Sequence, residues 1–310
     1  MTSQPLITFG VTCFNAEETI QNALLSALNQ TWENFEIIVV DDCSTDKSVQ
    51  VIETYEKQYD QIKLIQHKEN KGVAAARNTI LNNANGEFLA FFDDDDQSID
   101  ERISIQYKKI VAYEKFSGVE NIICHSARVQ KFPNKEKRYE PTLYSKNFAT
   151  TPKGSVVADM ILIGRPIGVP IGSMATCSQM AKLSTYQSVS GFNENLRRSE
   201  DTDLNVRLGL SGAHFLGIAD PLVHQTMTIS PDKLISEERK NALEWLRNHR
   251  SYLEKIGWWK HTIKWVDIKF DYLSGHKIKF LMRLIVLSFQ FPIKTGKRLW
   301  WASMNRTRNS

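Results

Sequence analysis

The chain has 310 residues, 42% of them hydrophobic and 24% charged, which is typical of a folded protein with a sizeable core. No stretch reaches the roughly 18 uncharged apolar residues of a membrane-spanning helix, and we expect no cleaved secretion signal because the N-terminus lacks a basic segment and a long apolar run. The charge is uneven: residues 234–310 carry 16 Lys or Arg against 6 Asp or Glu, and the rest carries 23 against 29. We therefore expect two regions with different roles.

Short apolar runs alternate with amphipathic segments over the first hundred residues. We expect strands at residues 6–14, 35–40, 62–66 and 87–92, with helices between them. Asn15, with Glu18 three residues later, predicts a capping box at the start of the first helix. This alternation is typical of the α/β class, with a Rossmann-like, mostly parallel sheet covered by helices on both faces.

The pattern is less regular in the second half. The expected elements are a helix around residues 103–111, a strand at 121–126, loops over 131–172 with a short helix near 156–163, a strand at 171–177, a helix at 200–210 and a strand at 214–218. Beyond residue 230 the pattern is helical, beginning with one long helix over 236–256.

Acidic residues end two of the four leading strands: Asp41-Asp42 follow one strand, and the run from Asp93 to Asp96 follows another. In open parallel sheets, ligands bind beyond the carboxyl ends of the strands. Consecutive carboxylates repel one another and raise each other's pKa, and a divalent cation relieves that repulsion. Magnesium or manganese binds to one or two carboxylates together with phosphate oxygens of a substrate. We therefore expect a metal-bound diphosphate at this edge of the sheet.

Each acidic group also has a structural interpretation. Asp41-Asp42, followed by Ser44-Thr45, can simply start a turn and cap a helix. The run from Asp93 to Asp96 can be a solvated loop. Glu200-Asp201 opens a helix, where carboxylates suit the helix dipole. Spacing alone leaves these alternatives open.

A series of short segments gives more specific information. In order they are Val11 to Asn15, Gln30-Thr31, Val40 to Asp46, Asn70 to Gly72, Ala76 to Asn78, Ala84 to Glu87, Phe92 to Asp96, Gly191 to Glu194 and Glu200-Asp201. Together they resemble glycosyltransferase family 2, which has the GT-A fold, over about Leu6 to His224. Cys43 departs from the family, which usually has glycine there, so we expect this turn to avoid a positive φ.

The resemblance implies that a nucleoside-diphosphate sugar binds at the strand ends. Thr12 and Asp42 would contact the nucleobase, with Asp42 accepting a hydrogen bond from the N–H of its ring. Further residues expected at the donor are Asn15, Arg77, Asp93 near the ribose, and Asp94. UDP is the expected carrier, because it is the most frequent in the family.

The resemblance also implies a metal site. Asp95, together with Asp93, would hold Mn²⁺ or Mg²⁺ on the diphosphate, and Asp96 would flank it. In similar enzymes a histidine near the position of His224 sometimes completes the metal site. A structural histidine is the alternative for His224.

For catalysis, the resemblance implies that Asp201 is the general base and that Glu200 supports the site. Arg207 would orient this acidic pair or form a salt bridge with it. The reaction would be a single displacement that inverts the anomeric carbon, without a covalent intermediate. We divide the chain into a nucleotide-sugar-binding half (1–110), an acceptor-binding and catalytic half of the same domain (111–230), and a basic helical extension (231–310).

The basic region contains six of the seven tryptophans, interspersed with Lys and Arg. One interpretation is a helical appendage packed on the catalytic domain. The other is a surface that lies on an anionic membrane, because Trp and Lys/Arg both favour the headgroup region. In the second case the acceptor is a lipid-linked saccharide or a cell-envelope glycan, and the protein is cytoplasmic and peripheral on the inner face of the membrane.

Two other functions are compatible with parts of the sequence. A nucleotidyltransferase also places metal-binding carboxylates beside a nucleotide, but it needs a glycine-rich basic phosphate loop, and residues 12–18 contain neither Gly nor Lys/Arg. A non-enzymatic module that binds membranes or nucleic acid would explain the basic region but not the acidic strand ends. We expect no nucleic-acid partner.

Overall fold

The computed structural model describes residues 4–227 and 235–308. The strands are β1 (Ile7–Cys13), β2 (Phe35–Asp41), β3 (Ile62–Gln66), β4 (Phe88–Asp93), β5 (Gln97–Ser98), β6 (Ile122–Lys131), β7 (Lys137–Glu140), β8 (Met180–Lys182) and β9 (His214–Thr226). The helices up to β9 are α1 (Ile20–Leu28), α2 (Ser48–Gln58), α3 (Val73–Asn83), α4 (Arg102–Ser117), α5 (Ser155–Ile163), α6 (Leu183–Gln187) and α7 (Glu200–Leu210). The C-terminal helices are α8 (Ile235–Asn248), α9 (Arg250–Lys255), α10 (Trp259–Leu273), α11 (Lys277–Gln290) and α12 (Pro292–Arg308).

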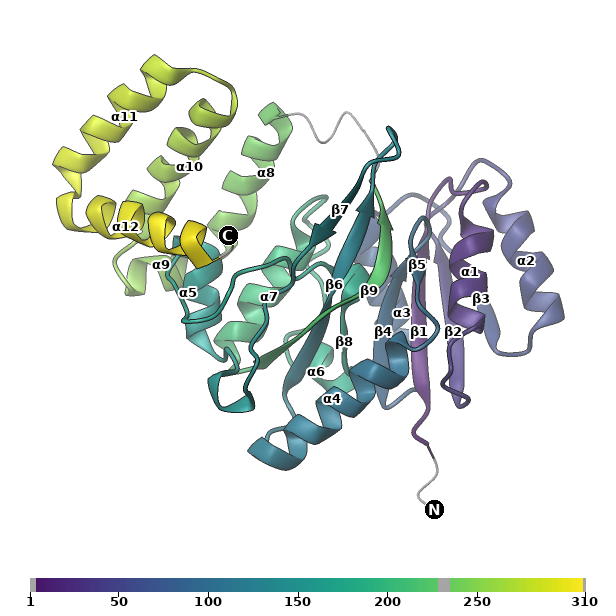
Figure 1. Ribbon diagram of the computed structural model, residues 1–310. Helices are drawn as coiled ribbons and strands as arrows, with labels where there is room; N and C mark the ends of the chain where they lie inside the picture. Colours follow the sequence, from purple (N-terminus) through teal and green to yellow (C-terminus); the bar gives the residue numbers. More distant parts are fainter. Residues whose placement is uncertain (1–3, 228–234, 309–310) are drawn as a thin grey trace.

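The strands form one sheet in the order β3-β2-β1-β4-β8-β6-β9-β5, with β7 paired to β6. β3, β2, β1 and β4 are parallel to their neighbours, and β6 is parallel to β9. β8 runs antiparallel to both β4 and β6. The expected α/β class is therefore confirmed: a central sheet flanked by helices, with a helical C-terminal region (Figure 1).

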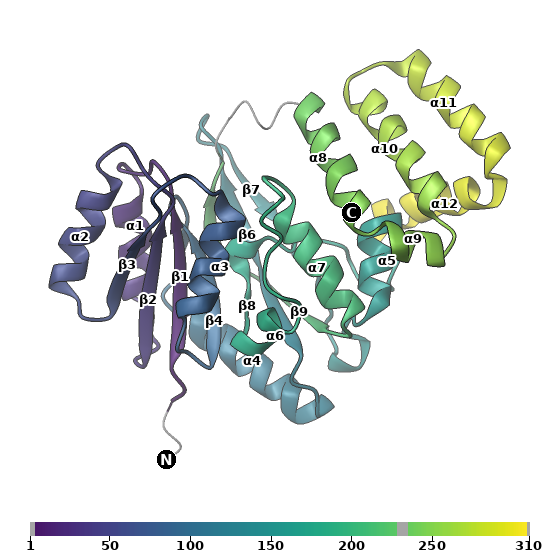
Figure 2. The ribbon, with the colours of Figure 1, turned by 180° about the vertical axis from the view of Figure 1, so that it is seen from behind.

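Helices cover both faces of the sheet (Figures 1 and 2). Leu24 of α1, Ile52 of α2 and Ile110 of α4 belong to the core on one face. Ile80 of α3 and Leu204 of α7 belong to the core on the other face. Because β4 is buried between these cores, its sequence is continuously apolar up to Phe92. β1 is equally buried, but it alternates apolar residues, which belong to the first core, with Thr and Gly.

The first helix begins later than the capping box predicts. α1 follows Thr19, whose side chain makes no capping hydrogen bond. Asn15 has a φ of +50° and lies in the loop after β1, where its Oδ1 accepts a hydrogen bond from the backbone N of Thr45 at 2.8 Å. The predicted capping box is wrong, because the Asn15 side chain joins the loops after β1 and β2 instead.

The strand predicted at residues 171–177 is also wrong. This segment forms an isolated bridge at Ser173 and then the short 3₁₀ helix η2 (Thr176–Ser178). Side chains replace strand pairing: the carbonyl of Met174 accepts from the amides of Gln179 and Asn205 at 3.2 and 3.0 Å. Apolar residues in a buried loop thus give the same sequence pattern as a strand.

The last strand is longer than expected. β9 continues past residue 218 to Thr226, because the pairing with β6 resumes at Pro221 after an irregularity. Asp220 and Pro221 resemble the end of a strand in the sequence, but here they occupy a bulge. β9 thereby brings Gln225 and Thr226 to the carboxyl ends of the leading strands.

The C-terminal helices α8 to α10 pack on the rest of the fold. The long helix predicted at 236–256 is interrupted at His249, which separates α8 from α9. Leu246, Leu253 and Trp258 pack with Leu162 of α5 and Val206 of α7 in a third core. The packed-appendage interpretation thus describes α8 to α10. Within the described ranges, no helix has both the length and the apolar character needed to cross a membrane.

Candidate active site

A cavity of about 1060 Å³ lies at the carboxyl ends of β1, β2 and β4. The residues predicted from the sequence that line it are Thr12, Asp42, Arg77, Asp93, Asp94, Asp95, Asp96, Glu200 and Asp201. Asn15 and His224 are not among the described residues that line it. Segments that are far apart in the sequence meet here because the ends of parallel strands lie at one edge of the sheet.

Asp42, at the end of β2, is buried and already holds the neighbouring loop. Its Oδ1 accepts from the backbone N of Lys71 at 2.9 Å and lies 2.7 Å from Nδ1 of His67. Its Oδ2 accepts from the backbone N of Gly72 at 2.7 Å. Since a carboxylate oxygen can accept two hydrogen bonds, Oδ2 retains one position for a ligand in the cavity.

Gly72 is the residue that permits this arrangement. Its φ is +91°, and a Cβ added there would lie 2.6 Å from Nη1 of Arg197. The backbone conformation therefore favours glycine, and a side chain there would displace the flexible end of Arg197. The Asn70-Lys71-Gly72 segment thus serves to hold Asp42 in the cavity wall.

The aspartates that follow β4 have different partners. Oδ2 of Asp94 accepts from the backbone N of Phe14 at 2.8 Å, so it joins the loops after β4 and β1. Oδ1 of Asp96 accepts from the backbone N of Thr226 at 2.8 Å. Burial, and then repulsion from the neighbouring carboxylates, raises the pKa of Asp94 to about 7. The same two causes raise the pKa of Asp96 well above its ordinary value.

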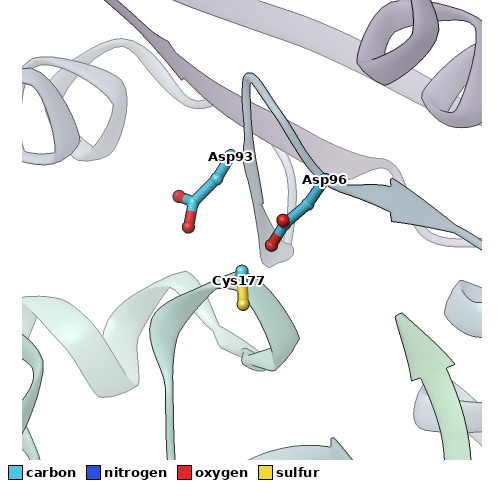
Figure 3. Close-up of side chains that lie close together, drawn as sticks. All are labelled: Asp93, Asp96 and Cys177. Carbon is cyan, nitrogen blue, oxygen red and sulfur yellow. The ribbon is translucent and has the colours of Figure 1, made fainter. Parts of the chain in front are cut away.

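Asp93, Asp96 and Cys177 each bring a potential metal-ligand atom within 4.8 Å of the other two (Figure 3). Oδ2 of Asp96 is buried and has no nitrogen or oxygen donor among the described residues. Burial, and then the two carboxylates, raises the pKa of Cys177, so its sulfur is a neutral thiol. A hard divalent cation such as Mg²⁺ or Mn²⁺ fits this carboxylate-rich group, because it would relieve the repulsion between the carboxylates.

The two other predicted metal ligands lie outside this three-residue group. Asp95 lines the cavity beside it. His224 lies on β9 opposite Gln97 of β5, and burial followed by the charges of Lys131 and Lys137 lowers the pKa of its imidazole. This placement favours the structural alternative for His224.

Arg77 of α3 connects the two acidic regions. Its Nη1 lies 2.6 Å from Oε1 of Glu200, and its Nη2 lies 3.2 Å from Oδ1 of Asp93. Burial alone would lower the pKa of this guanidinium, but the carboxylates of Asp93, Glu200 and Asp201 raise it. Arg77 is therefore a fixed positive charge between strand β4 and helix α7.

Asp201 lies half-buried in the first turn of α7 and faces the cavity. Its Oδ1 accepts a hydrogen bond from the backbone N of Thr202 at 2.6 Å. Among the described residues of this helix turn, none bonds to its Oδ2. Glu200 is buried against Arg77, and burial followed by the charge of Asp201 raises its pKa despite that ion pair. The two adjacent carboxylates thus differ, with Asp201 the more accessible one.

The prediction that Arg207 orients or pairs with Glu200 and Asp201 is wrong. Its Nε lies 2.7 Å from Oδ2 of Asp203, and its Nη1 donates to the carbonyls of Val189 and Gly191 at 2.6 and 2.7 Å. Residues four positions apart are neighbours on a helix, so Asp203 is the natural partner. Arg207 therefore fixes the Gly191 loop to α7.

The expectation for Cys43 is wrong as well. Its φ is +67°, which costs a residue with a side chain about 1–2 kcal/mol. Hydrogen bonds on the C-terminal side of the turn offset this strain, since Oδ2 of Asp41 accepts from the backbone N of Ser44 at 3.0 Å. Cys43 thus adopts a backbone conformation that usually favours glycine.

Sequence reasoning missed one side of the cavity entirely. The C-terminal helices contribute Glu238, Asn241, Ala242 and Trp245 from α8 and Lys269 and Phe270 from α10. The spacing of the four α8 residues places them on one helix face. This spacing is the only feature of the sequence that could have suggested that they line the cavity together. Cys177 was missed because it lies in the segment predicted as a strand.

A family model described as Glycosyl transferase family 2 matches residues 8–178, more than half of the chain. The chain is 29% identical over 212 residues to EpsE of Bacillus subtilis (strain 168), which is named as a glycosyltransferase; the match covers 67% of this chain and 68% of EpsE. It is 31% identical over 133 residues to TuaG of the same strain, whose name refers to teichuronic acid biosynthesis; this match covers 42% of the chain and only 52% of TuaG.

Among solved structures, the chain is similar to S. aureus TarS 1–349, crystallised in complex with UDP-GlcNAc. The TM-score is 0.58 at 19% identity, and the match covers 92% of this chain and 91% of that chain. At this identity the similarity concerns the fold, and it confirms the expected GT-A type.

Proposed function

The chain belongs to glycosyl transferase family 2, and on this premise we propose that it transfers a sugar from a nucleoside diphosphate to an acceptor hydroxyl, with inversion at the anomeric carbon. The observation that carries the proposal is the single cavity lined by Asp42, Asp95 and Asp201. Family membership favours this activity over nucleotidyl transfer and over a non-enzymatic binding module. In this proposal residues 1–110 bind the donor and residues 111–230 carry the general base.

The donor end of the cavity suits a nucleotide. Asp42 has one free acceptor position on Oδ2 for the N–H of a base, and Thr12 lies beside it in the cavity wall. Asp93 is held by Arg77 near the proposed position of the ribose. The TarS complexes with UDP and UDP-GlcNAc support UDP as the carrier.

A divalent cation, Mn²⁺ or Mg²⁺, is part of the proposal. Asp93 and Asp95 would hold it, with Asp96 beside them, and when bound it would neutralise charge on the departing diphosphate. Oδ2 of Asp96, which has no nitrogen or oxygen donor among the described residues, and the raised pKa values of Asp94 and Asp96 support this assignment. Arg77 adds a fixed positive charge that contacts the carboxylates of Asp93 and Glu200 next to this site.

Asp201 is the proposed general base. As a carboxylate in the cavity, it takes the proton from the acceptor hydroxyl while the acceptor oxygen attacks the anomeric carbon. The attacking and leaving oxygens lie on opposite faces of the sugar, so the configuration inverts in one step. Glu200, neutralised by Arg77, positions the start of α7 rather than reacting itself.

The activity is tested by incubating the full chain with UDP-, GDP- and dTDP-sugars and measuring release of the nucleotide, with and without Mn²⁺. We expect metal-dependent release from a UDP-sugar. The proposal fails if none of the three carriers is consumed, or if thermal unfolding does not respond to UDP and Mn²⁺.

The acceptor is proposed to be a lipid-linked saccharide or a glycan of the cell envelope, reached at the inner face of the membrane. The name of TuaG supports an envelope glycan. Helices α11 and α12 support a membrane surface: Ile278, Ile285, Phe289 and Ile293 are between 55% and 84% exposed. Residues 272–310 contain eight Lys or Arg and no Asp or Glu, and basic residues gain about 1 kcal/mol each near anionic lipid.

Vesicle flotation tests this surface. We expect the chain to float with phosphatidylglycerol vesicles and to bind phosphatidylcholine vesicles at least about 10-fold more weakly. Phe289→Gln should weaken binding by about 10-fold, because an exposed apolar ring no longer enters the lipid. Phe116→Gln, which changes a phenylalanine that is 60% exposed on α4, is the matched control and should bind normally. Equal loss in both variants would remove α11 from the proposal.

A further inference from the structure

The cavity offers more space than the donor end alone requires. Its volume of about 1060 Å³ is at the upper limit of sites for a single small ligand. The residues assigned to the donor come from β1, β2, β4 and α3, and the general base comes from α7. The remaining wall includes α8 and α10, which no step of the proposed donor binding uses.

This wall is held firmly to the helix that carries Asp201. Nε2 of His249, at the end of α8, lies 2.8 Å from Oδ1 of Asp203 on α7, and both side chains are almost fully buried. The hydroxyl of Tyr252 donates to Asp159 of α5 at 2.8 Å. In Figures 1 and 2, α7 lies between the sheet and α8. The wall and the base are therefore fixed relative to each other.

The chemistry of the wall suits a sugar ring. Glu238, Asn241 and Trp245 follow one another at helical spacing on α8, so they share one face. The Trp245 indole is half-buried and packs edge to face with the His249 ring, with 5.7 Å between the ring centroids. A flat aromatic surface covers the C–H face of a saccharide, while amide and carboxylate groups bond its hydroxyls. Lys269 of α10 adds a cation at the same cavity.

We infer that the α8 face of the cavity is the acceptor site, and that it binds a saccharide whose ring stacks on Trp245. This inference rests on the proposed function and adds where the acceptor binds and which residue its ring contacts. It also moves part of acceptor binding from residues 111–230 into the C-terminal helices. Trp245 is a binding residue for the acceptor, whereas the donor end is complete without it.

The test compares two tryptophans of the same region. Trp245 and Trp259 are both half-buried against the same third core, but Trp259 does not line the cavity among the described residues. Transfer of radiolabel is measured from the UDP-sugar that the wild type consumes to the glycan and glycolipid fraction extracted from envelopes of the source cells. Hydrolysis of the UDP-sugar without acceptor is measured in parallel.

For Trp245→Ala we expect the KM for the acceptor fraction to rise about 10-fold or more, while hydrolysis of the UDP-sugar stays within about 2-fold of the wild type. Trp245→Phe should recover part of the loss, because it keeps an aromatic surface. Trp259→Ala should transfer like the wild type. The inference is wrong if Trp245→Ala transfers with an unchanged KM, or if both alanine variants lose transfer and hydrolysis together. A wild type that consumes no UDP-sugar would instead refute the proposed function itself.

Discussion

The two sides of the cavity are built in different ways. On the strand side, Asp42, Asp94 and Asp96 follow buried parallel strands, and the carboxylate of each accepts a hydrogen bond from a backbone N–H of another segment. On the helix side, Trp245 and Lys269 come from a basic, tryptophan-rich region. Tryptophans of this region occur in the cavity wall (Trp245), in the third core (Trp258) and on the exposed surface (Trp300).

This difference between strand ends and helix faces explains why the sequence indicated one side of the cavity and not the other. At the end of a buried parallel strand, the topology alone fixes where a side chain lies, so an acidic pair there indicates a site. On an amphipathic helix, the face that meets the site depends on tertiary packing. α8 places its apolar residues in the third core, whereas α11 leaves Ile285 and Phe289 exposed, although both helices have strong amphipathic patterns.

The largest expected effect is on the rate of transfer, at the proposed general base on α7. Asp201→Asn removes the proposed base and should slow transfer by about 100-fold or more, because general-base catalysis contributes that much. UDP affinity, measured by calorimetry, should be unchanged, since Asp201 is not assigned to the nucleotide. Asp220→Asn changes an exposed carboxylate on β9 and serves as the control. Normal transfer by Asp201→Asn would exclude this residue as the base.

Asp95→Ala tests whether the strand side depends on a cation. We expect the affinity for UDP in the presence of Mn²⁺ to fall by about 10-fold, and the affinity without Mn²⁺ to change little. Calorimetric titrations under both conditions measure the difference. If Mn²⁺ strengthens UDP binding equally in the wild type and the variant, the metal is held without Asp95, and the group formed by Asp93, Asp96 and Cys177 becomes the better assignment.

Much of the fold and of the strand side could be predicted from the sequence, because apolar runs of strand length fix parallel strands and their ends. What failed has local physical reasons. Asn15 bonds another loop instead of capping a helix, and Cys43 adopts a positive φ that hydrogen bonds nearby make tolerable. His224 could not be placed because β9 continues through a bulge at Asp220 and Pro221.

Gly72→Ala probes the loop that holds Asp42. The variant must keep a positive φ, and the exposed end of Arg197 must move away from a Cβ that would otherwise lie 2.6 Å from it, so we expect a loss of about 2 kcal/mol in the free energy of unfolding and weaker UDP binding. Gly164→Ala is the control, since its φ is +73° but nothing lies within 4 Å of the added Cβ. It should cost only the conformational strain, about 1 kcal/mol. Equal losses in urea unfolding would show that the contact with Arg197 relaxes freely.

The smallest expected effect concerns the contact between His249, which follows α8, and Asp203 of α7. Although burial alone would raise it, hydrogen bonding to His249 and the charge of Arg207 lower the pKa of Asp203. A carboxyl group with a lowered pKa in the folded state stabilises the protein above its ordinary pKa of 3.8, and this contribution is lost as the pH falls through the folded value. His249→Leu should therefore reduce the free energy of unfolding by about 1–2 kcal/mol at pH 6, and by progressively less as the pH falls through the folded pKa of Asp203, where this carboxyl group becomes protonated. Urea unfolding over a series of pH values from 6 downwards measures this, with the exposed His276→Leu as the control. A difference that does not change with pH would mean that His249 stabilises the wall by packing alone, without a contribution from the contact between its ring and the Asp203 carboxylate.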